Sequence, residues 1–186
     1  MLSEVPGIAA ADTPTGLLFT RGRAKGARLL QIDGANDSPQ TITGLADNGA
    51  VAVRPIDRDA QEDAREVTWS GHARGTLLVA NPRATDLSRA GPLALSITVR
   101  IDETPVAPVA LELKCGPGCS ARLDVTARLT AIAGAGWTTL VVPLQCLPGA
   151  DLSRVTAPFA LSTGGRMRLS LSSVALVPSK GSPACS

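Results

Sequence analysis

Aromatic side chains are scarce in this chain of 186 residues, which has two Trp, two Phe and no Tyr. Proteins that bind single-stranded nucleic acid need several aromatic platforms and a clustered basic surface. The chain has neither, because its 18 basic and 16 acidic residues are interspersed and give a net charge of only +2. The composition therefore argues against nucleic acid as a partner.

Long hydrophobic runs are also missing. A transmembrane helix needs about 18 or more apolar residues in succession, so we expect no membrane partner. The first residues, from Met1 to Pro6, have neither the basic nor the apolar segment of a secretory signal. We interpret them as an initiator methionine placed before the interior of a longer protein, and we expect residues 1–15 to be a linker or an extended arm.

Signatures of catalysis are few. Nucleophilic triads usually need a His beside a Ser or Cys, and the single His, His72, lies in a turn-like segment at residues 70–74. The glycine pair at Gly134 and Gly136 lacks the Lys and the following helix of a phosphate-binding loop. We therefore predict that this chain is not an enzyme and has no catalytic residues.

Alternating hydrophobic segments are abundant. Residues 92–102 alternate over their whole length, and residues 109–115, 140–146 and 167–177 repeat the pattern. A period of two is typical of half-buried antiparallel strands. The phase of the last segment slips at Ser172-Ser173, which indicates a β-bulge.

Shorter strands are predicted at residues 17–19, 28–32, 51–54, 67–69 and 76–79, and a short helix or helical turn at residues 123–132. The 18 Gly and 14 Pro suit the many turns between them. This pattern predicts an all-β fold, a β-sandwich of the jelly-roll type with one or two short helical turns. It would occupy residues 16–178 and be followed by a flexible tail at residues 179–186.

Four cysteines are present, and Cys115, Cys119 and Cys146 lie at the ends of predicted strands. Cys115 and Cys119 can close a small disulfide ring across Gly-Pro-Gly, or either can reach Cys146. Free buried thiols are the alternative. A zinc site needs four ligands at tighter paired spacing, so we predict disulfides at these three candidates and no zinc.

The densest acidic segment runs from Asp57 to Asp63, where acids alternate with Arg58 and precede Arg65. Ion pairing on an exposed loop or helical turn is the plain interpretation. The alternative is a site for sugar hydroxyls or for a structural calcium ion held by Asp57, Asp59 and Asp63. No other cofactor is expected.

Exposed Trp or Tyr rings usually provide the platform on which sugars stack. Trp137 begins a predicted strand and Trp69 follows Val67 with the same parity. We expect both indoles, and Phe159, to lie in the core.

Several motifs in a fixed order carry a resemblance to a known family. A strand ends in Cys115-Gly-Pro-Gly-Cys119, and Leu-Asp-Val-Thr at residues 123–126 follows. Next come Gly-Trp-Thr-Thr-Leu at 136–140, Pro-Leu-Gln-Cys at 143–146, Gly-Ala-Asp-Leu-Ser at 149–153 and Pro-Phe at 158–159. Together with the acidic segment at residues 57–64 and Trp69, this order resembles the C-terminal galactose-binding-like domain of bacterial family-three glycoside hydrolases, the exo-β-glucanases and β-glucosidases.

The resemblance covers roughly residues 17–177. It implies a jelly-roll domain joined to a catalytic barrel and a second α/β domain, which hold the nucleophilic Asp and the acid Glu of that family. The family is exported, which implies a periplasmic or extracellular location and agrees with disulfide bonds. Leu147 stands where relatives often have Phe, which keeps an apolar side chain at that position.

On this basis we expect a non-catalytic accessory domain that contributes substrate contacts or stability to the catalytic domains of a parent glycosidase. The alternative is an autonomous carbohydrate-binding module for β-glucans. Since the aromatic residues are expected in the core, polar side chains are the candidates for contact with a β-glucan or glucose-type oligosaccharide. They are Gln31, Arg58, Asp59 and Gln61.

Overall fold

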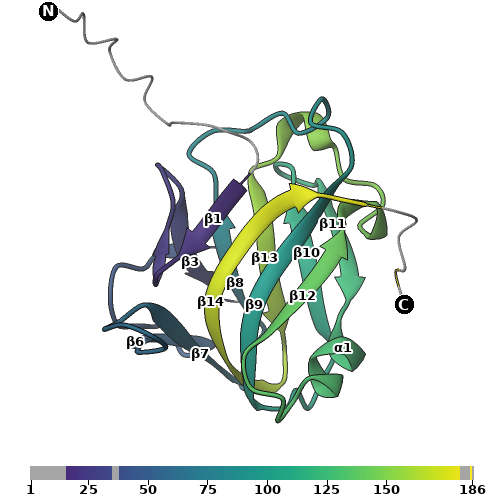
Figure 1. The fold of residues 1–186 in the computed structure, drawn as a ribbon. Helices are drawn as coiled ribbons and strands as arrows, with labels where there is room; N and C mark the ends of the chain where they lie inside the picture. The colour runs from purple at the N-terminus through teal and green to yellow at the C-terminus, as the bar shows by residue number, and fades with distance from the viewer. Residues whose placement is uncertain (1–15, 35–37, 181–184, 186) are drawn as a thin grey trace, which may run out of the picture.

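In a computed structural model, the structure describes residues 16–34, 38–180 and 185. They form two antiparallel β-sheets that face each other across a hydrophobic core, with β14, β9 and β12 in front of β13, β8 and β10 in Figure 1. The predicted β-sandwich is confirmed. The predicted linker at residues 1–15 lies outside the described residues.

The larger sheet has eight strands. They are β1 (Gly16–Thr20), β2 (Arg23–Ala24), β5 (Ala46–Asp47), β6 (Val51–Ile56), β7 (Ala64–Ser70), β9 (Leu93–Glu103), β12 (Thr138–Pro143) and β14 (Arg166–Pro178). Their order is β12-β9-β14-β7-β6-β5, with β1 pairing with both β14 and β2. The predicted bulge is present in β14, where the register shifts between Leu171 and Ser173 and the partner on one side changes from β7 to β1.

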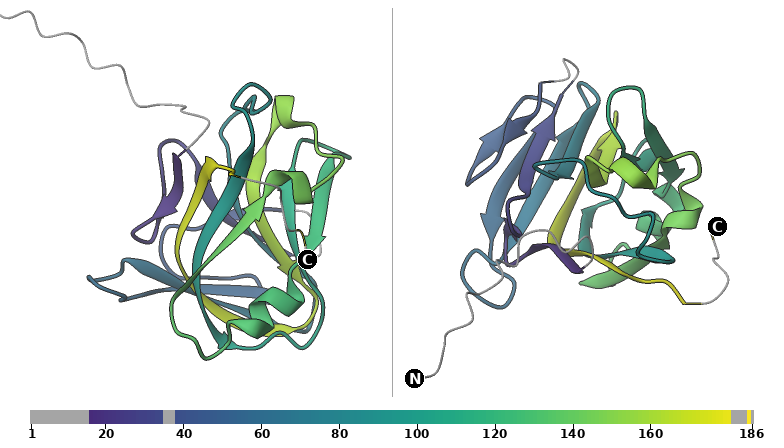
Figure 2. Two further views of the ribbon diagram at one scale, coloured as in Figure 1. Left: turned by 45° about the vertical axis from the view of Figure 1, so that its right-hand side comes forward. Right: turned by 90° about the horizontal axis from the view of Figure 1, so that it is seen from above.

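The smaller sheet has six strands in the order β11-β10-β13-β8-β3-β4. They are β3 (Leu29–Asp33), β4 (Gln40–Thr41), β8 (Gly75–Ala80), β10 (Val109–Lys114), β11 (Ser120–Asp124) and β13 (Ala157–Thr163). Further views of the two layers are given in Figure 2.

Helical structure is limited to α1 (Thr126–Ala131) and two short 3₁₀ turns, η1 (Leu144–Cys146) and η2 (Leu152–Arg154), among the described residues. Two predicted boundaries need correction. The helix predicted from residue 123 begins at Thr126, because Asp124 Oδ1 accepts hydrogen bonds from the N–H and hydroxyl of Thr126 and ends β11 there. The strand predicted to residue 146 ends at Pro143, which has no N–H to continue the ladder.

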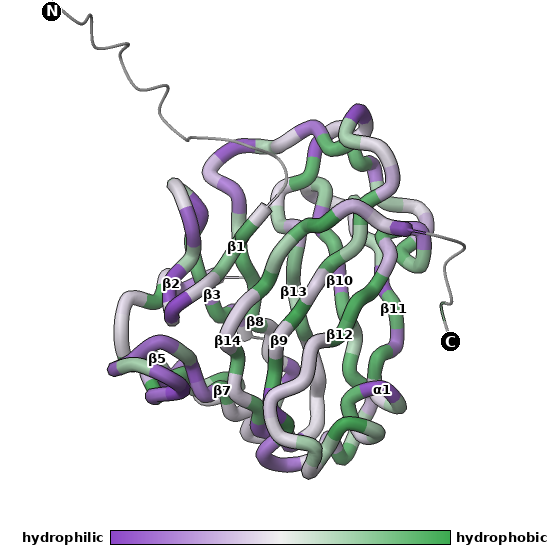
Figure 3. The backbone as a smooth tube through the Cα atoms, viewed as in Figure 1, coloured by the Kyte–Doolittle hydropathy of each residue, from purple (hydrophilic) through white to green (hydrophobic). Residues whose placement is uncertain are grey.

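No helix in the described part of the chain has the length and hydrophobicity needed to cross a membrane. Figure 3 shows the hydrophobic residues concentrated along the strands and the hydrophilic residues around β2 and β5.

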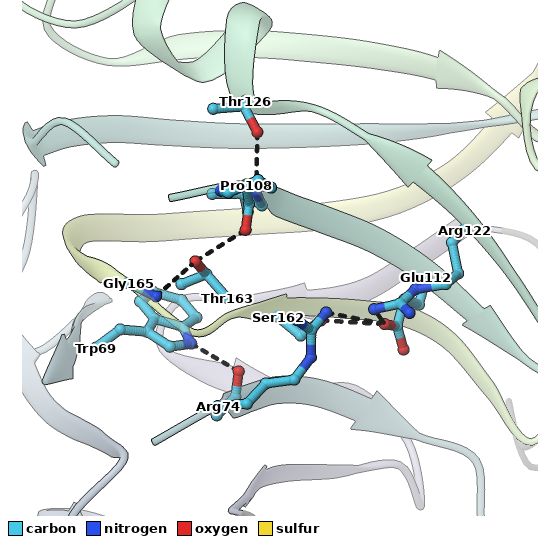
Figure 4. Close-up of polar contacts among 11 residues, drawn as sticks. Trp69, Arg74, Pro108, Glu112, Arg122, Thr126, Ser162, Thr163 and Gly165 are labelled. Carbon is cyan, nitrogen blue, oxygen red and sulfur yellow. Dashed lines mark hydrogen bonds and ion pairs between the residues drawn. The ribbon is translucent and has the colours of Figure 1, made fainter. Parts of the chain in front are cut away.

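The core contains Phe19, Trp69 and Phe159, each exposed by no more than 1%. The Trp69 Nε1–H donates to the carbonyl of Gly75 at 3.0 Å, so the one polar atom of the indole is satisfied inside the core (Figure 4). The prediction that Trp69 and Phe159 lie in the core is therefore confirmed.

All four cysteines are paired. Cys115 bonds to Cys119, and Cys146 bonds to Cys185. The sequence pointed to Cys115, Cys119 and Cys146 but gave no role to Cys185, which belongs to the tail predicted to be flexible. Cys185 is joined to the sandwich, whereas residues 181–184 and 186 of that tail lie outside the described residues.

Candidate functional site

Trp137 is the aromatic residue that the fold leaves at the surface. It directly precedes β12, in which Leu140 and Val142 turn inward while Thr139 and Val141 are exposed. Trp137 shares the parity of the outward pair and is half-buried. The expectation that Trp137 lies in the core is therefore wrong, and strand parity gives the physical reason.

Two guanidinium groups lie over the Trp137 ring. The Arg58 Cζ is 4.8 Å from the ring centroid and the Arg100 Cζ is 5.2 Å from it. Both distances are within the range of cation–π attraction. The ring therefore forms the centre of a charged patch on the outer face of the larger sheet.

Hydrogen bonds fix these guanidinium groups in place. The Arg100 Nε donates to Asp102 Oδ1 at 2.6 Å, and the Arg100 Nη2 donates to Ser170 Oγ at 3.2 Å. The Ser170 hydroxyl in turn donates to Asp102 Oδ2 at 2.6 Å. Arg58 Nη1 donates to Ser172 Oγ at 2.8 Å. We call this set the Trp137 surface; it consists of Arg58, Arg100, Asp102, Trp137, Ser170 and Ser172.

The polar row continues across the sheet. Arg100 pairs with Ser170, Ser170 with Glu66, and Glu66 with Arg54, so that the row crosses β9, β14, β7 and β6. Arg54 Nε donates to Glu66 Oε1 at 2.6 Å, and this bond holds the pKa of Arg54 above its ordinary value. The row ends in a hollow of about 380 Å³ that is lined by Arg54, Glu66, Thr68 and residues of β5 and β6.

Of the four residues expected to contact sugar, the structure brings Arg58 and Asp59 together and places Gln61 and Gln31 elsewhere. Arg58 belongs to the Trp137 surface, and Asp59 Oδ2 lies 3.5 Å from the Arg58 Nε. Gln61 lines another hollow beside Arg65. Gln31 is on the smaller sheet, where its Nε2 donates to Thr41 Oγ1 at 3.3 Å.

The segment from Asp57 to Asp63 is an exposed loop, held by its own carboxylates. Asp63 accepts the N–H groups of Arg58, Asp59 and Ala60 at 2.6–3.0 Å, and Asp57 accepts that of Glu62 at 2.7 Å. Among the described residues, the structure groups no three His, Cys, Asp or Glu side chains suited to a metal ion. A structural calcium here stays a prediction, which melting curves with and without a chelator would test.

A second polar cluster lies on the smaller sheet around Glu112 (Figure 4). Glu112 Oε1 forms an ion pair with Arg122 Nη2 at 2.8 Å and accepts a hydrogen bond from the Ser162 hydroxyl at 3.0 Å. Arg74 Nη2 donates to the same Ser162 oxygen at 3.0 Å. This cluster has no aromatic side chain, so the Trp137 surface is the better candidate for contact with a sugar.

Sequence comparison assigns most of the chain to one family. The sequence profile of Exop_C, described as galactose-binding domain-like, matches residues 29–176. None of the curated proteins compared with the chain matches it at the sequence level.

The extra C-terminal domain of the exo-1,3/1,4-β-glucanase ExoP from a Pseudoalteromonas species has a similar fold. The TM-score is 0.74 at 22% identity, over 91% of this chain and 96% of that domain. In the larger structure of the same enzyme the match has a TM-score of 0.72 at 22% identity and covers 93% of this chain. It covers only 22% of that enzyme chain.

Carbohydrate-binding modules of Clostridium thermocellum are also similar. A family 30 module of a cellulosomal cellulase matches with a TM-score of 0.59 at 12% identity, over 89% of this chain and 98% of the module. A family 11 module, solved with a β-1,3-1,4-mixed-linked tetrasaccharide, matches with a TM-score of 0.52 at 11% identity, over 81% of this chain and 97% of the module. At these identities the likeness concerns the fold.

Proposed function

Because the chain belongs to the Exop_C family of galactose-binding domain-like modules, we propose that it is a non-catalytic accessory domain of a bacterial family-three exo-β-glucanase or β-glucosidase. Its similarity to the extra C-terminal domain of ExoP supports this role.

The observation that carries the proposal is the half-buried Trp137 between β9, β12 and the loop at residues 57–63. A half-buried indole beside fixed guanidinium and carboxylate groups can contact both the apolar face and the hydroxyl groups of a sugar. Arg58 and Arg100 already cover part of the ring. This surface therefore suits a domain that adds contacts to a polymer held by catalytic domains better than one that binds tightly alone.

Kinetics of the full-length enzyme that carries this chain would test the proposal. We expect Trp137→Ala to raise KM for a mixed-linkage β-glucan about three- to tenfold, as loss of a contact worth about 1 kcal/mol would. Hydrolysis of a small aryl glucoside should be unaffected. Val141→Ala, on the same outer face, is the matched control, since Val141 is 56% exposed and lies outside the Trp137 surface. Unchanged KM on the polymer in Trp137→Ala would contradict a role in substrate contact.

An autonomous carbohydrate-binding module is the second candidate. The similar fold of the family 11 module crystallised with a mixed-linked tetrasaccharide favours it. Affinity electrophoresis of the isolated chain in gels containing mixed-linkage or β-1,3-glucan would decide between the two. Retardation that Trp137→Ala abolishes would support autonomous binding, whereas no retardation and no calorimetric heat at millimolar oligosaccharide would exclude it.

The pairing of all four cysteines favours a periplasmic or extracellular location, because disulfides persist in oxidising compartments. Cell fractionation of the native producer would test it: recovery of the protein in the cytosol with reduced thiols would contradict this part of the proposal.

A further inference from the structure

Arg65 is a charged residue on the inward-facing side of β7. It has the same parity as Val67 and Trp69, which are both buried in the core. Only 6% of Arg65 is exposed, and neither its Nε nor its Nη1 has a hydrogen-bond partner in the part of the chain that the structure describes. Native structures satisfy nearly all buried donors, and a buried charge without a partner is costly. Two buried donor atoms of the guanidinium therefore have no hydrogen-bond partner among the described residues.

A hollow of about 500 Å³ opens beside this guanidinium, between the β1–β2 hairpin, the segment at residues 43–44 and the loop before β7. We call it the Arg65 pocket; its charged lining consists of Arg21, Arg23, Lys25, Glu62 and Arg65. Four of these residues are cationic, and Glu62 is the one acid among them. The pocket is therefore strongly positive in a chain whose net charge is only +2.

Burial and the nearby charges both act on the pKa of Arg65, in part in opposite directions. Desolvation lowers the pKa of Arg65 from its ordinary value, Glu62 opposes this change, and Arg23 has a smaller effect that lowers the pKa further. An anion in the pocket would add opposite charge beside the guanidinium and favour its charged form.

The rim of the pocket is built from two tight turns. Among the described residues, Arg21 and Glu62 are the two non-glycine residues with positive φ, at 50° and 55°. A Cβ on Gly22 would come within 2.5 Å of the Glu62 carbonyl oxygen, so the two turns pack directly against each other. Such backbone conformations often occur at ligand sites, where the surrounding structure imposes them. The rim is held in shape before any ligand enters.

We propose that the Arg65 pocket binds a small oxyanion, namely a carboxylate, sulfate or phosphate group. A guanidinium presents several N–H donors to oxyanions and is the preferred partner of such groups in buried sites. Arg23 and Lys25 on the exposed rim attract the anion, and the Arg65 guanidinium pairs with it inside. The pocket shares no residue with the Trp137 surface, so this site is separate from contact with a neutral glucan.

Isothermal titration calorimetry of the whole chain at constant ionic strength would test the proposal. The probes are sulfate, inorganic phosphate and glucuronate, with glucose as the neutral counterpart of glucuronate. We expect saturable heat from at least one anion and none from glucose. Binding of glucuronate would identify the group as one carried by an acidic sugar, whereas binding of sulfate or phosphate alone would identify a free inorganic ion.

Two variants locate the site. Arg65→Met should abolish the heat, and it should melt no lower than the wild type in anion-free buffer, because an apolar chain replaces an unpaired buried charge. Arg23→Gln combined with Lys25→Gln keeps the interior intact and should weaken the affinity about three- to tenfold, as the loss of exposed charges does.

Arg89→Gln combined with Lys180→Gln removes the same charge from exposed positions outside the pocket and is the matched control. No saturable heat from any of the three anions, or equal affinity in Arg65→Met and the wild type, would overturn the proposal. If Arg65→Met fails to fold, equal affinity in the rim variant and its control would overturn it.

Discussion

At the scale of single residues, strand parity explains why the two tryptophans have different environments. Trp69 alternates with Val67 on the inward side of β7 and is 1% exposed. Trp137 directly precedes β12 and is out of phase with Leu140 and Val142, the inward residues of that strand. The phase of Trp137 relative to Leu140 was visible in the sequence and would have placed the indole on the outer face.

Gly75 lies where its neighbours leave no room for a side chain. A Cβ at this position would overlap Val51 and lie 3.2 Å from the Cβ of Ala50. Its carbonyl also accepts the indole N–H of Trp69. We expect Gly75→Ala to lower the free energy of unfolding by about 1–3 kcal/mol, the usual cost of overpacking, as measured by urea unfolding followed by Trp fluorescence.

Gly164→Ala is the matched control for that measurement. A Cβ on Gly164 meets no atom within 4 Å, so this variant should change the free energy of unfolding by at most about 0.5 kcal/mol. Equal urea midpoints for the two variants would show that a methyl group at position 75 fits without loss of stability, which would contradict the prediction.

At the scale of elements, hydrophobic alternation predicted the strands that bury one face. The segments that became β9, β10 and β14 alternate clearly, and the phase slip in β14 marks its bulge. Strand β13 was missed because all seven of its residues are buried, so it has no polar alternation to recognise. Strands β2, β4 and β5 have two residues each, which is too short for any period to appear.

The loop between β6 and β7 is held mainly by the Asp63 carboxylate and should respond to acid. The N–H groups of Arg58, Asp59 and Ala60 donate to Asp63, and these bonds, that of Arg58 foremost, hold the pKa of Asp63 below its ordinary value of 3.8. Because the folded pKa is lower than the unfolded one, this contribution to stability is present above about pH 4 and is lost as the pH falls through the folded pKa.

Asp63→Asn should therefore weaken protection of the amides at residues 58–60 at pH 6, and the difference from the wild type should shrink towards pH 2. Hydrogen exchange followed by NMR or mass spectrometry would measure it. Glu103→Gln, which changes another carboxylate at the end of β9, serves as the control and should leave these amides unchanged. Identical exchange of residues 58–60 in Asp63→Asn and the wild type at pH 6 would contradict the role of Asp63.

At the scale of the whole molecule, the sequence identified the family but only part of the site. Arg58 and Asp59 stood out because they are charged residues in a dense acidic segment. Trp137 and Ser172, which contact Arg58, are far from it along the chain, as is Arg100, which contacts the Trp137 ring. They come together because β9, β12 and β14 are neighbours in the larger sheet. That neighbourhood follows from long-range strand pairing, which local periodicity does not encode. Arg65 was noted only as a surface ion-pair partner, because the strand was predicted at residues 67–69, whereas β7 begins at Ala64 and gives Arg65 the parity of Val67 and Trp69.

The two disulfides should differ in their effect on global stability. The Cys146–Cys185 bond closes 39 residues, whereas the Cys115–Cys119 bond closes only 4. In the chain-entropy account the longer loop constrains the unfolded state more, by about 4 kcal/mol against about 2 kcal/mol. We expect Cys185→Ser to lower the free energy of unfolding more than Cys119→Ser does, as measured by urea unfolding under oxidising conditions. A reductant should then destabilise Cys185→Ser less than the wild type, and an equal loss in both would mean that the tail is not tied to the sandwich in solution.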